Sequence, residues 1–230
     1  MVLLAVFRGL RMAKRARAGR VRRRRSGVLP TVGLIVEGDT EYYALPLLAK
    51  NLPGCPPLKP VNLKGVGSDV SSAAIAKMVA PKVAQHWLAG RSKVVVCIDR
   101  ESRQQCAAGL AKEVADALVI EIQRFPNARG SLSVVIVDRA FEAWILADAK
   151  GLFARGVLAN APSFHCFEGR DGEQAGKGVV ELSRLLGRPY NKVVDGSQLF
   201  MRIDIGAARS FASGGSGSRS FDKFLRCLGV

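Results

Sequence analysis

Carboxylate side chains follow three apolar segments of the sequence. Glu37 ends TVGLIVEG and is followed by Glu41, Asp99 and Glu101 end KVVVCIDRE, and Glu142 comes shortly after SLSVVIVDR. A cluster of carboxylates repels itself unless a cation neutralises it. Hard oxygen ligands without a histidine or cysteine partner favour Mg²⁺ or Mn²⁺ over zinc. If the three segments end at one place, the sequence therefore predicts a Mg²⁺ or Mn²⁺ site.

The same acids have a simpler interpretation, in which each one caps a helix or pairs with a neighbouring cation such as Arg100 or Arg139. For a single acid that interpretation is the better one, but acids after three successive apolar segments favour the metal site. If the second segment stays extended as far as Glu101, its carboxylate and that of Asp99 project from one face about 6 to 7 Å apart. Asp138 stands near the end of the third segment, and Glu142 after it could reach the same edge.

Apolar runs alternate with helical patterns between residues 29 and 150. Continuous apolar runs, typical of strands buried on both faces, occupy 31–38, 93–101 and 131–139, and helical periods occupy 40–52, 68–90 and 103–125. This alternation predicts an α/β fold with a mostly parallel sheet flanked by helices. In such a sheet ligands bind outside the carboxyl ends of the strands, where the acids lie. We expect Thr40 to cap the first helix and Pro81 to be a point where the second helix can break.

The rest of the chain divides into a tail and a cap. Residues 1–25 hold ten Lys or Arg and no acid, which leaves +6 of the formal net charge of +16 for the remainder. We expect a basic, disordered tail at 1–28, an α/β core at 29–150 and a helical C-terminal cap at 151–230. The tail residues Arg22, Arg23, Arg24 and Arg25 are a candidate nucleic-acid-binding arm, because clustered arginines release counterions from nucleic acid. The alternative is a solvated extension.

Composition also indicates where the protein works. The apolar stretch of the tail precedes its charges and is too short to span a bilayer, so we expect neither secretion nor membrane insertion. A mitochondrial presequence, or a misread start with initiation at Met12, would also fit the tail. Five scattered cysteines without a C-x-x-C pair suggest neither a disulfide framework nor a zinc knuckle, and a cytoplasmic location fits best. Assembly into a homo-oligomer is left open.

Several motifs resemble those of known proteins. VEGDTE after an apolar strand, followed by VVVCIDRE, is similar to the TOPRIM pattern of a Glu after the first strand and a D-x-D after a later one. FEAWILAD, YNKVVDG and SFDKFLRCLG resemble a bacterial family of TOPRIM proteins that is related to the OLD-type nucleases and often associated with phage defence. The resemblance covers residues 30–230 and implies a Rossmann-like TOPRIM core that binds Mg²⁺.

The resemblance also implies roles for individual residues. It makes Glu37 a metal ligand or general acid/base, Glu41 a second acid beside it, and Asp99 the first acid of the D-x-D. Glu101 stands where the second Asp is expected, which keeps the charge but lengthens the arm by one methylene. Glu142 is the acid of the E-A-W motif. The implied metal ligands are Glu37, Asp99, Glu101 and Glu142.

Two other motif residues have alternative roles. Lys192, in YNK, could contact a scissile phosphate and take part in catalysis, although a surface lysine is the commoner fate. Trp144 is expected to pack between the core and the cap rather than stack on a base.

The resemblance narrows the expected reaction to phosphoryl transfer. The chain has no room for the further domains of a topoisomerase or primase, so metal-dependent hydrolysis of DNA or RNA is the expected activity. No G-x-x-x-x-G-K-[ST] sequence occurs, and the ATPase that controls OLD-type nucleases would therefore be a separate subunit. The alternative is a non-catalytic nucleic-acid-binding or adaptor module with a degenerate TOPRIM site, which the Glu101 departure and the basic tail favour.

Overall fold

The computed structural model describes residues 29–67, 69–163, 177–210 and 217–230, so Arg22 to Arg25 and the rest of the tail lie outside it. Its sheet consists of four parallel strands in the order β2-β1-β3-β4, which confirms the expected α/β class. The strands are β1 (Val32–Val36), β2 (Leu58–Asn62), β3 (Lys93–Asp99) and β4 (Ser131–Val137).

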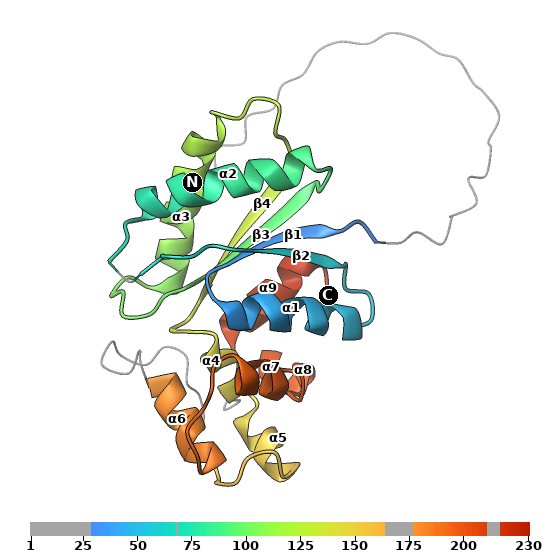
Figure 1. Ribbon diagram of the computed structural model, residues 1–230, viewed down its shortest axis with the longest axis vertical. Coiled ribbons are helices and arrows are strands. Elements are labelled where there is room, and N and C mark those ends of the chain that lie inside the picture. The colour runs from blue at the N-terminus through green and yellow to red at the C-terminus, as the bar shows by residue number, and fades with distance from the viewer. Residues whose placement is uncertain (1–28, 68, 164–176, 211–216) are drawn as a thin grey trace, which may run out of the picture.

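Helices cover both faces of the sheet (Figure 1). Helices α2 (Ser72–Leu88) and α3 (Ala107–Ile122) pack on one face, and α1 (Asp39–Asn51) packs on the other. Successive strand residues point to opposite faces, so Leu34 enters the cluster under α1 while Ile35 enters the cluster under α2. Burial on both sides explains why these strands read as unbroken apolar runs.

The strand order creates a switch point between β1 and β3. From β1 the chain crosses through α1 to β2 on one side, and then through α2 to β3 on the other side of β1. Ligands of open α/β sheets bind outside the carboxyl ends of the strands at such a point. The residues that follow β1 and β3 are therefore the ones best placed to form a site.

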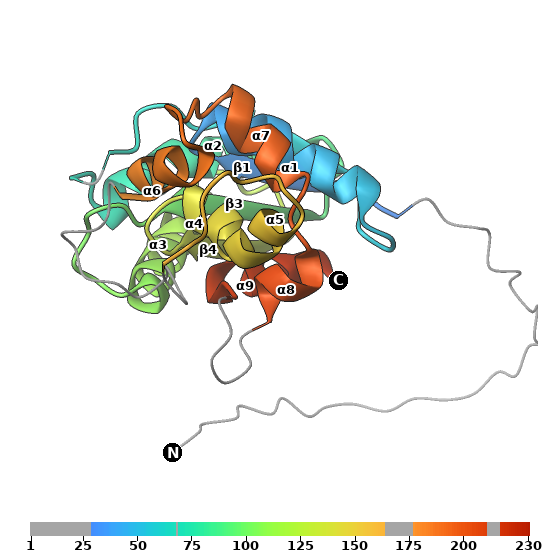
Figure 2. The ribbon, with the colours of Figure 1, turned by 90° about the horizontal axis from the view of Figure 1, so that it is seen from below.

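The rest of the described chain is helical and lies on the α1 face, as Figures 1 and 2 show. Its buried side chains join the same hydrophobic cluster as the strand residues beneath α1. Trp144 is fully buried there against Phe221 and Phe224, and its Nε1 donates a hydrogen bond to Ser220 Oγ at 2.7 Å, so it packs as expected. The helices are α4 (Glu142–Leu146), α5 (Ala149–Ala154), α6 (Lys177–Leu186), α7 (Val194–Phe200), α8 (Ile205–Arg209) and α9 (Arg219–Leu228).

Two local expectations were wrong. Gly38, not Thr40, is the N-cap of α1, and Thr40 Oγ1 instead donates a hydrogen bond to the carbonyl oxygen of Lys192 at 3.0 Å. Helix α2 runs without a break through Pro81. Its buried residues, among them Val79 and Val83, anchor both halves on the sheet, and this packing outweighs the loss of one backbone hydrogen bond.

Candidate functional site

A cavity of about 290 Å³ lies at the carboxyl ends of β1 and β3. It collects residues from the β1–α1 turn, the end of β3, the start of α4 and the segment before α7. All the expected site residues of the described chain line it: Glu37, Glu41, Asp99, Glu101, Glu142 and Lys192. Sequence positions more than 150 residues apart thus meet at the switch point, as the parallel sheet predicts.

Glu37 connects the ends of the two central strands. Its Oε2 accepts a hydrogen bond from the backbone N–H of Asp99 at 3.2 Å. Burial raises the pKa of the Glu37 carboxyl to about 7. The hydrogen bond from Asp99 lowers this pKa, and repulsion from Glu101 and Glu41 raises it further. The carboxyl can therefore exchange a proton near neutral pH.

Glu41 lies in the first turn of α1 and is buried. A Cβ on Gly38 would overlap the Glu41 carboxylate, so glycine at this position lets the acid fold back over the start of the helix. Desolvation raises the pKa of Glu41 to about 7, repulsion from Glu142 adds to the shift, and the ammonium of Lys192 opposes it. Two carboxyls of the cavity thus titrate near neutral pH.

Asp99 ends β3 in the centre of the site. Its Oδ1 is buried and accepts no hydrogen bond from any residue in the described ranges. Desolvation, followed by repulsion from Glu41, Glu37 and Glu142, raises the pKa of Asp99 well above its ordinary value. A buried acceptor without a partner is costly, and a bound cation or a donor from a ligand would relieve that cost.

Glu101 departs from the expected geometry. Strand β3 ends at Asp99, so the two acids do not project from one extended face. Glu101 has a φ of 49°, a left-handed conformation, and its N–H donates to the carbonyl oxygen of Arg139 at 2.6 Å. Arg139 also has a positive φ, of 78°, so the turns after β3 and β4 hold one another in this shape.

Glu142 and Lys192 complete the cavity from the C-terminal half of the chain. Glu142 is buried in the first turn of α4, and the Nζ of Lys192 lies 3.7 Å from its Oε1. The Lys192 side chain is 60% exposed, so its ammonium stands at the mouth of the cavity rather than inside it. The hydrogen bond from Thr40 fixes the Lys192 backbone against α1.

Some acids have the simpler role of pairing with a cation. Asp138 forms an ion pair with Arg100, which follows Asp99 in the sequence. Asp148 pairs with Arg155 at 2.6 Å. These acids hold the surrounding loops together and do not line the acidic cavity.

Sequence reasoning missed two residues of the site. Asp39 lines the cavity and accepts a hydrogen bond from Asn62 Nδ2 at 2.6 Å, which fixes the start of α1 to the end of β2. Asp39 lies inside VEGDTE between Glu37 and Glu41, so the same motif could have identified it. Thr40 was expected to be a cap, and its contact with the Lys192 backbone had no local signal.

The donor chemistry of the cavity suits a hard divalent cation. The acids supply only oxygen ligands, and Asp99 offers a buried oxygen without a partner. Within the described residues, however, no three His, Cys, Asp or Glu side chains converge as they would in a formed metal site. Binding of Mg²⁺ or Mn²⁺ would therefore require the glutamate side chains to rotate toward Asp99.

Comparison of the chain with protein-family models, with curated proteins and with solved structures finds no match. The fold and the cavity define an α/β protein with an acidic site at its switch point. Among the helices that the structure describes, none combines the length and the apolar character needed to cross a membrane.

Proposed function

We propose that this protein is a metal-dependent nuclease of the TOPRIM type, which hydrolyses phosphodiester bonds in DNA or RNA. One observation carries the proposal: acids from three separate segments and one exposed lysine line a single cavity at the switch point of a parallel sheet. Such a cavity can hold cations and receive a phosphate, the two requirements of phosphoryl-transfer chemistry.

The residues of the cavity would have different roles in the hydrolysis. Glu37, Asp99, Glu101 and Glu142 would hold one or two Mg²⁺ or Mn²⁺ ions, which supply an acidified water and neutralise charge on the phosphate. Lys192 would bind the phosphate from the mouth of the cavity. Glu41, whose pKa is raised to about 7, is suited to exchange a proton during the reaction.

The proposed partners follow from the substrate and from the resemblance. Arg22 to Arg25 would bind the nucleic-acid backbone outside the site. A separate ATPase subunit would control cleavage, as in the OLD-type systems that the sequence resembles, and phage defence would be the setting. Activity of the isolated chain is then expected to be low but measurable.

Cleavage of labelled nucleic acids tests the proposal. Plasmid, single-stranded DNA and structured RNA would be incubated with Mg²⁺, Mn²⁺ or EDTA, together with Glu37→Gln and Asp99→Asn. Asp116→Asn is the matched control, because Asp116 is an exposed acid on α3 that pairs only with its helical neighbour Lys112 among the described residues. Cleavage that needs metal, survives in the control and disappears in both site variants supports the nuclease. Cleavage unaffected by Asp99→Asn would refute it.

The alternative, a non-catalytic nucleic-acid-binding or adaptor module, is favoured by the left-handed turn at Glu101 and by the lack of three converging ligands within the described ranges. Salt and metal dependence separate the two functions. Purely electrostatic binding weakens steeply with salt and survives EDTA. A working metal site instead binds substrate more tightly with Mg²⁺ or Mn²⁺ and loses this response in Asp99→Asn.

A further inference from the structure

Strand β4 is one edge of the sheet, and its outer side has unpaired backbone groups. The N–H of Ser131 donates to the carbonyl oxygen of Ser92, and the carbonyl oxygen of Val137 accepts from the N–H of Arg100. The backbone N–H and C=O groups of the odd-numbered residues of β4 therefore point toward β3, and those of the even-numbered residues point away from it. Consistent with this, the N–H of Asp138 turns outward and donates to Ser220 Oγ.

The outward-facing residues within β4 are Leu132, Val134 and Ile136. Their outward N–H and C=O groups form no hydrogen bond with any part of the chain that the structure describes. Val134 and Ile136 are nevertheless buried, at 7% and 4% exposed. A row of unpaired N–H and C=O groups at a sheet edge is a ready template for pairing with another strand.

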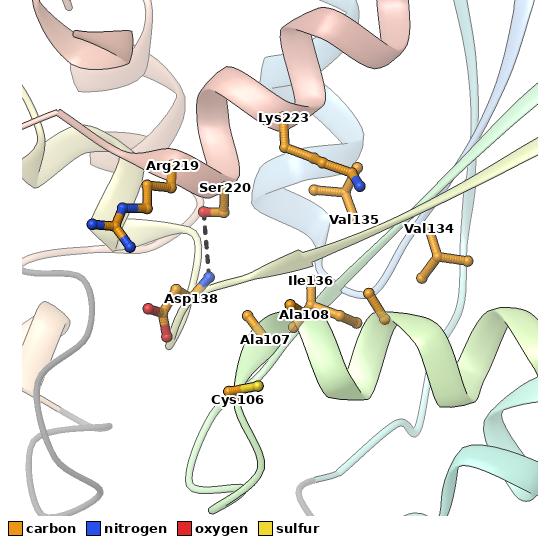
Figure 3. Close-up of a pocket in the computed structure, with 11 residues that line it drawn as sticks. Cys106, Ala107, Ala108, Val134, Val135, Ile136, Asp138, Arg219, Ser220 and Lys223 are labelled. Carbon is orange, nitrogen blue, oxygen red and sulfur yellow. Dashed lines mark hydrogen bonds between the residues drawn. The ribbon is translucent and has the colours of Figure 1, made fainter. Parts of the chain in front are cut away.

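A groove of about 420 Å³ runs along this edge (Figure 3). Its α3 wall is built from small side chains, those of Ala107, Ala108 and Ala111. Its α9 wall carries Arg219 and Lys223, which are four residues apart and so lie on one face of the helix. Each side of the groove thus accepts a different kind of side chain.

The two walls match the two faces of a strand. Side chains of an added strand alternate between the α3 side and the α9 side. Those on the α3 side would lie beside Val134, Ile136 and the alanines, where small walls leave room for apolar groups. Those on the α9 side would lie near Lys223, which forms no ion pair with any residue of the described ranges.

We propose that the β4 edge is a docking site for an extended segment of a partner protein in which apolar and acidic residues alternate. The segment adds a fifth strand to the sheet beside β4 and pairs with Leu132, Val134 and Ile136 through its backbone. Its apolar side chains fill the α3 side of the groove, and its acids pair with Lys223. This surface is separate from the acidic cavity and does not depend on nuclease activity.

Charge excludes two other occupants. A second copy of this chain would present its own β4, whose sequence SLSVVIV contains no acid to meet Lys223. Residues 1–25 contain ten Lys or Arg and no acid, so the tail would place like charges against the α9 wall. An acidic, alternating partner segment is the occupant that both walls favour.

Amide hydrogen exchange of the full-length protein tests the proposal. The probe is an acetylated and amidated peptide of alternating Val and Glu, as long as the seven residues of β4. Binding should slow exchange at Leu132, Val134 and Ile136 by at least about tenfold while leaving Val135, which already faces β3, unchanged. A peptide of alternating Val and Lys, and an alternating Val and Glu peptide with methylated backbone nitrogens, are the negative controls.

Two groove variants and one control variant keep the result interpretable. Lys223→Glu should weaken binding of the Val and Glu peptide by about tenfold or more, whereas Lys77→Glu, on the exposed side of α2, should change it less than about twofold. Ala108→Phe should block the groove without changing a charge. Equal binding of the Val and Lys peptide, or unchanged exchange at the outward amides, would overturn the proposal. Protection that grows with protein concentration alone would overturn it in favour of a dimer edge.

Discussion

The Oε2 of Glu37 accepts a hydrogen bond from the backbone N–H of Asp99 at 3.2 Å, so the first acid of the site is fixed to the strand that carries the second. The bond crosses the switch point between β1 and β3. It brings two carboxyls together where desolvation already disfavours their charged forms. A bound cation would favour the charged forms of both carboxyls and so lower their pKa values.

The first prediction concerns pH. The pKa values of Glu37 and Glu41 are raised from 4.5 to about 7 in the folded protein, so the folded state holds protons that the unfolded state has released. The free energy of unfolding should therefore fall as pH rises from about 4.5 to about 7, by on the order of 1–3 kcal/mol in EDTA. Mg²⁺ should reduce this fall. Urea unfolding across this range, with EDTA or Mg²⁺, measures it, and stability rising with pH in EDTA would contradict it.

The second prediction concerns Asp99→Asn. Cleavage should fall at least about 100-fold, because the variant loses the central metal ligand. Stability in EDTA at neutral pH should stay equal or increase, since Asn cannot carry the charge that burial and the neighbouring acids disfavour at Asp99. Cleavage rates and urea midpoints, compared with those of Asp116→Asn, give both values. A destabilised and inactive Asp99→Asn would show instead that Asp99 is a structural residue.

The third prediction concerns Lys192. Replacement by Met should lower cleavage about 10- to 100-fold, because the ammonium at the cavity mouth is lost. Unfolding free energy should fall by about 1 kcal/mol or less, since the lysine of the pair with Glu142 is 60% exposed and the Thr40 bond goes to the Lys192 backbone. Lys192→Arg should recover part of the rate. Equal rates in all three proteins would remove Lys192 from the reaction.

The fourth prediction concerns Trp144. Trp144→Phe should destabilise the protein by about 1–3 kcal/mol, because Ser220 Oγ loses a buried donor and the aromatic cluster loses volume. Trp87→Phe is the matched control, since the Trp87 side chain is only partly buried and its Nε1 has no hydrogen-bond partner among the described residues. Thermal unfolding separates the two. A Trp144 variant as stable as the Trp87 variant would contradict this packing role.

The fifth prediction concerns the basic tail. Removal of residues 1–28 should weaken nucleic-acid binding and make it less sensitive to salt, because each lost phosphate contact lowers the slope of log K against log salt by about 0.9 on duplex DNA. Titrations at several salt concentrations measure this slope. The acidic cavity is unchanged in the truncated chain, so Mg²⁺-dependent cleavage of saturating substrate should persist. Unchanged affinity after truncation would refute the arm.

The local pattern of apolar residues predicted most of the fold. Unbroken apolar runs identified β1, β3 and β4, because strands covered on both faces have no polar side to interrupt them. The position of Glu37, Asp99 and Glu142 after such runs predicted their meeting, since parallel strands end at one edge. The composition of these segments, mostly Val, Ile and Leu, was sufficient for that inference.

Contacts between distant segments could not be predicted from the local pattern of apolar residues. The left-handed turn at Glu101 depends on Arg139 after the neighbouring strand, and the position of Lys192 depends on Thr40 in α1. Neither contact has a signal in the residues around it, because a hydrogen bond between distant segments depends on the packing of both.

The sequence by itself thus determined the α/β class and which acids stand at strand ends, because side-chain periodicity is set by each segment's own surroundings. Only the tertiary structure decided the strand order, which makes β1 and β3 neighbours and leaves β4 at an edge. It also decided that Asp99 has a buried oxygen without a partner in the described chain and that the outer side of β4 is unpaired. Strand order and burial depend on contacts between segments that are far apart in the sequence, so no single stretch of residues can specify them.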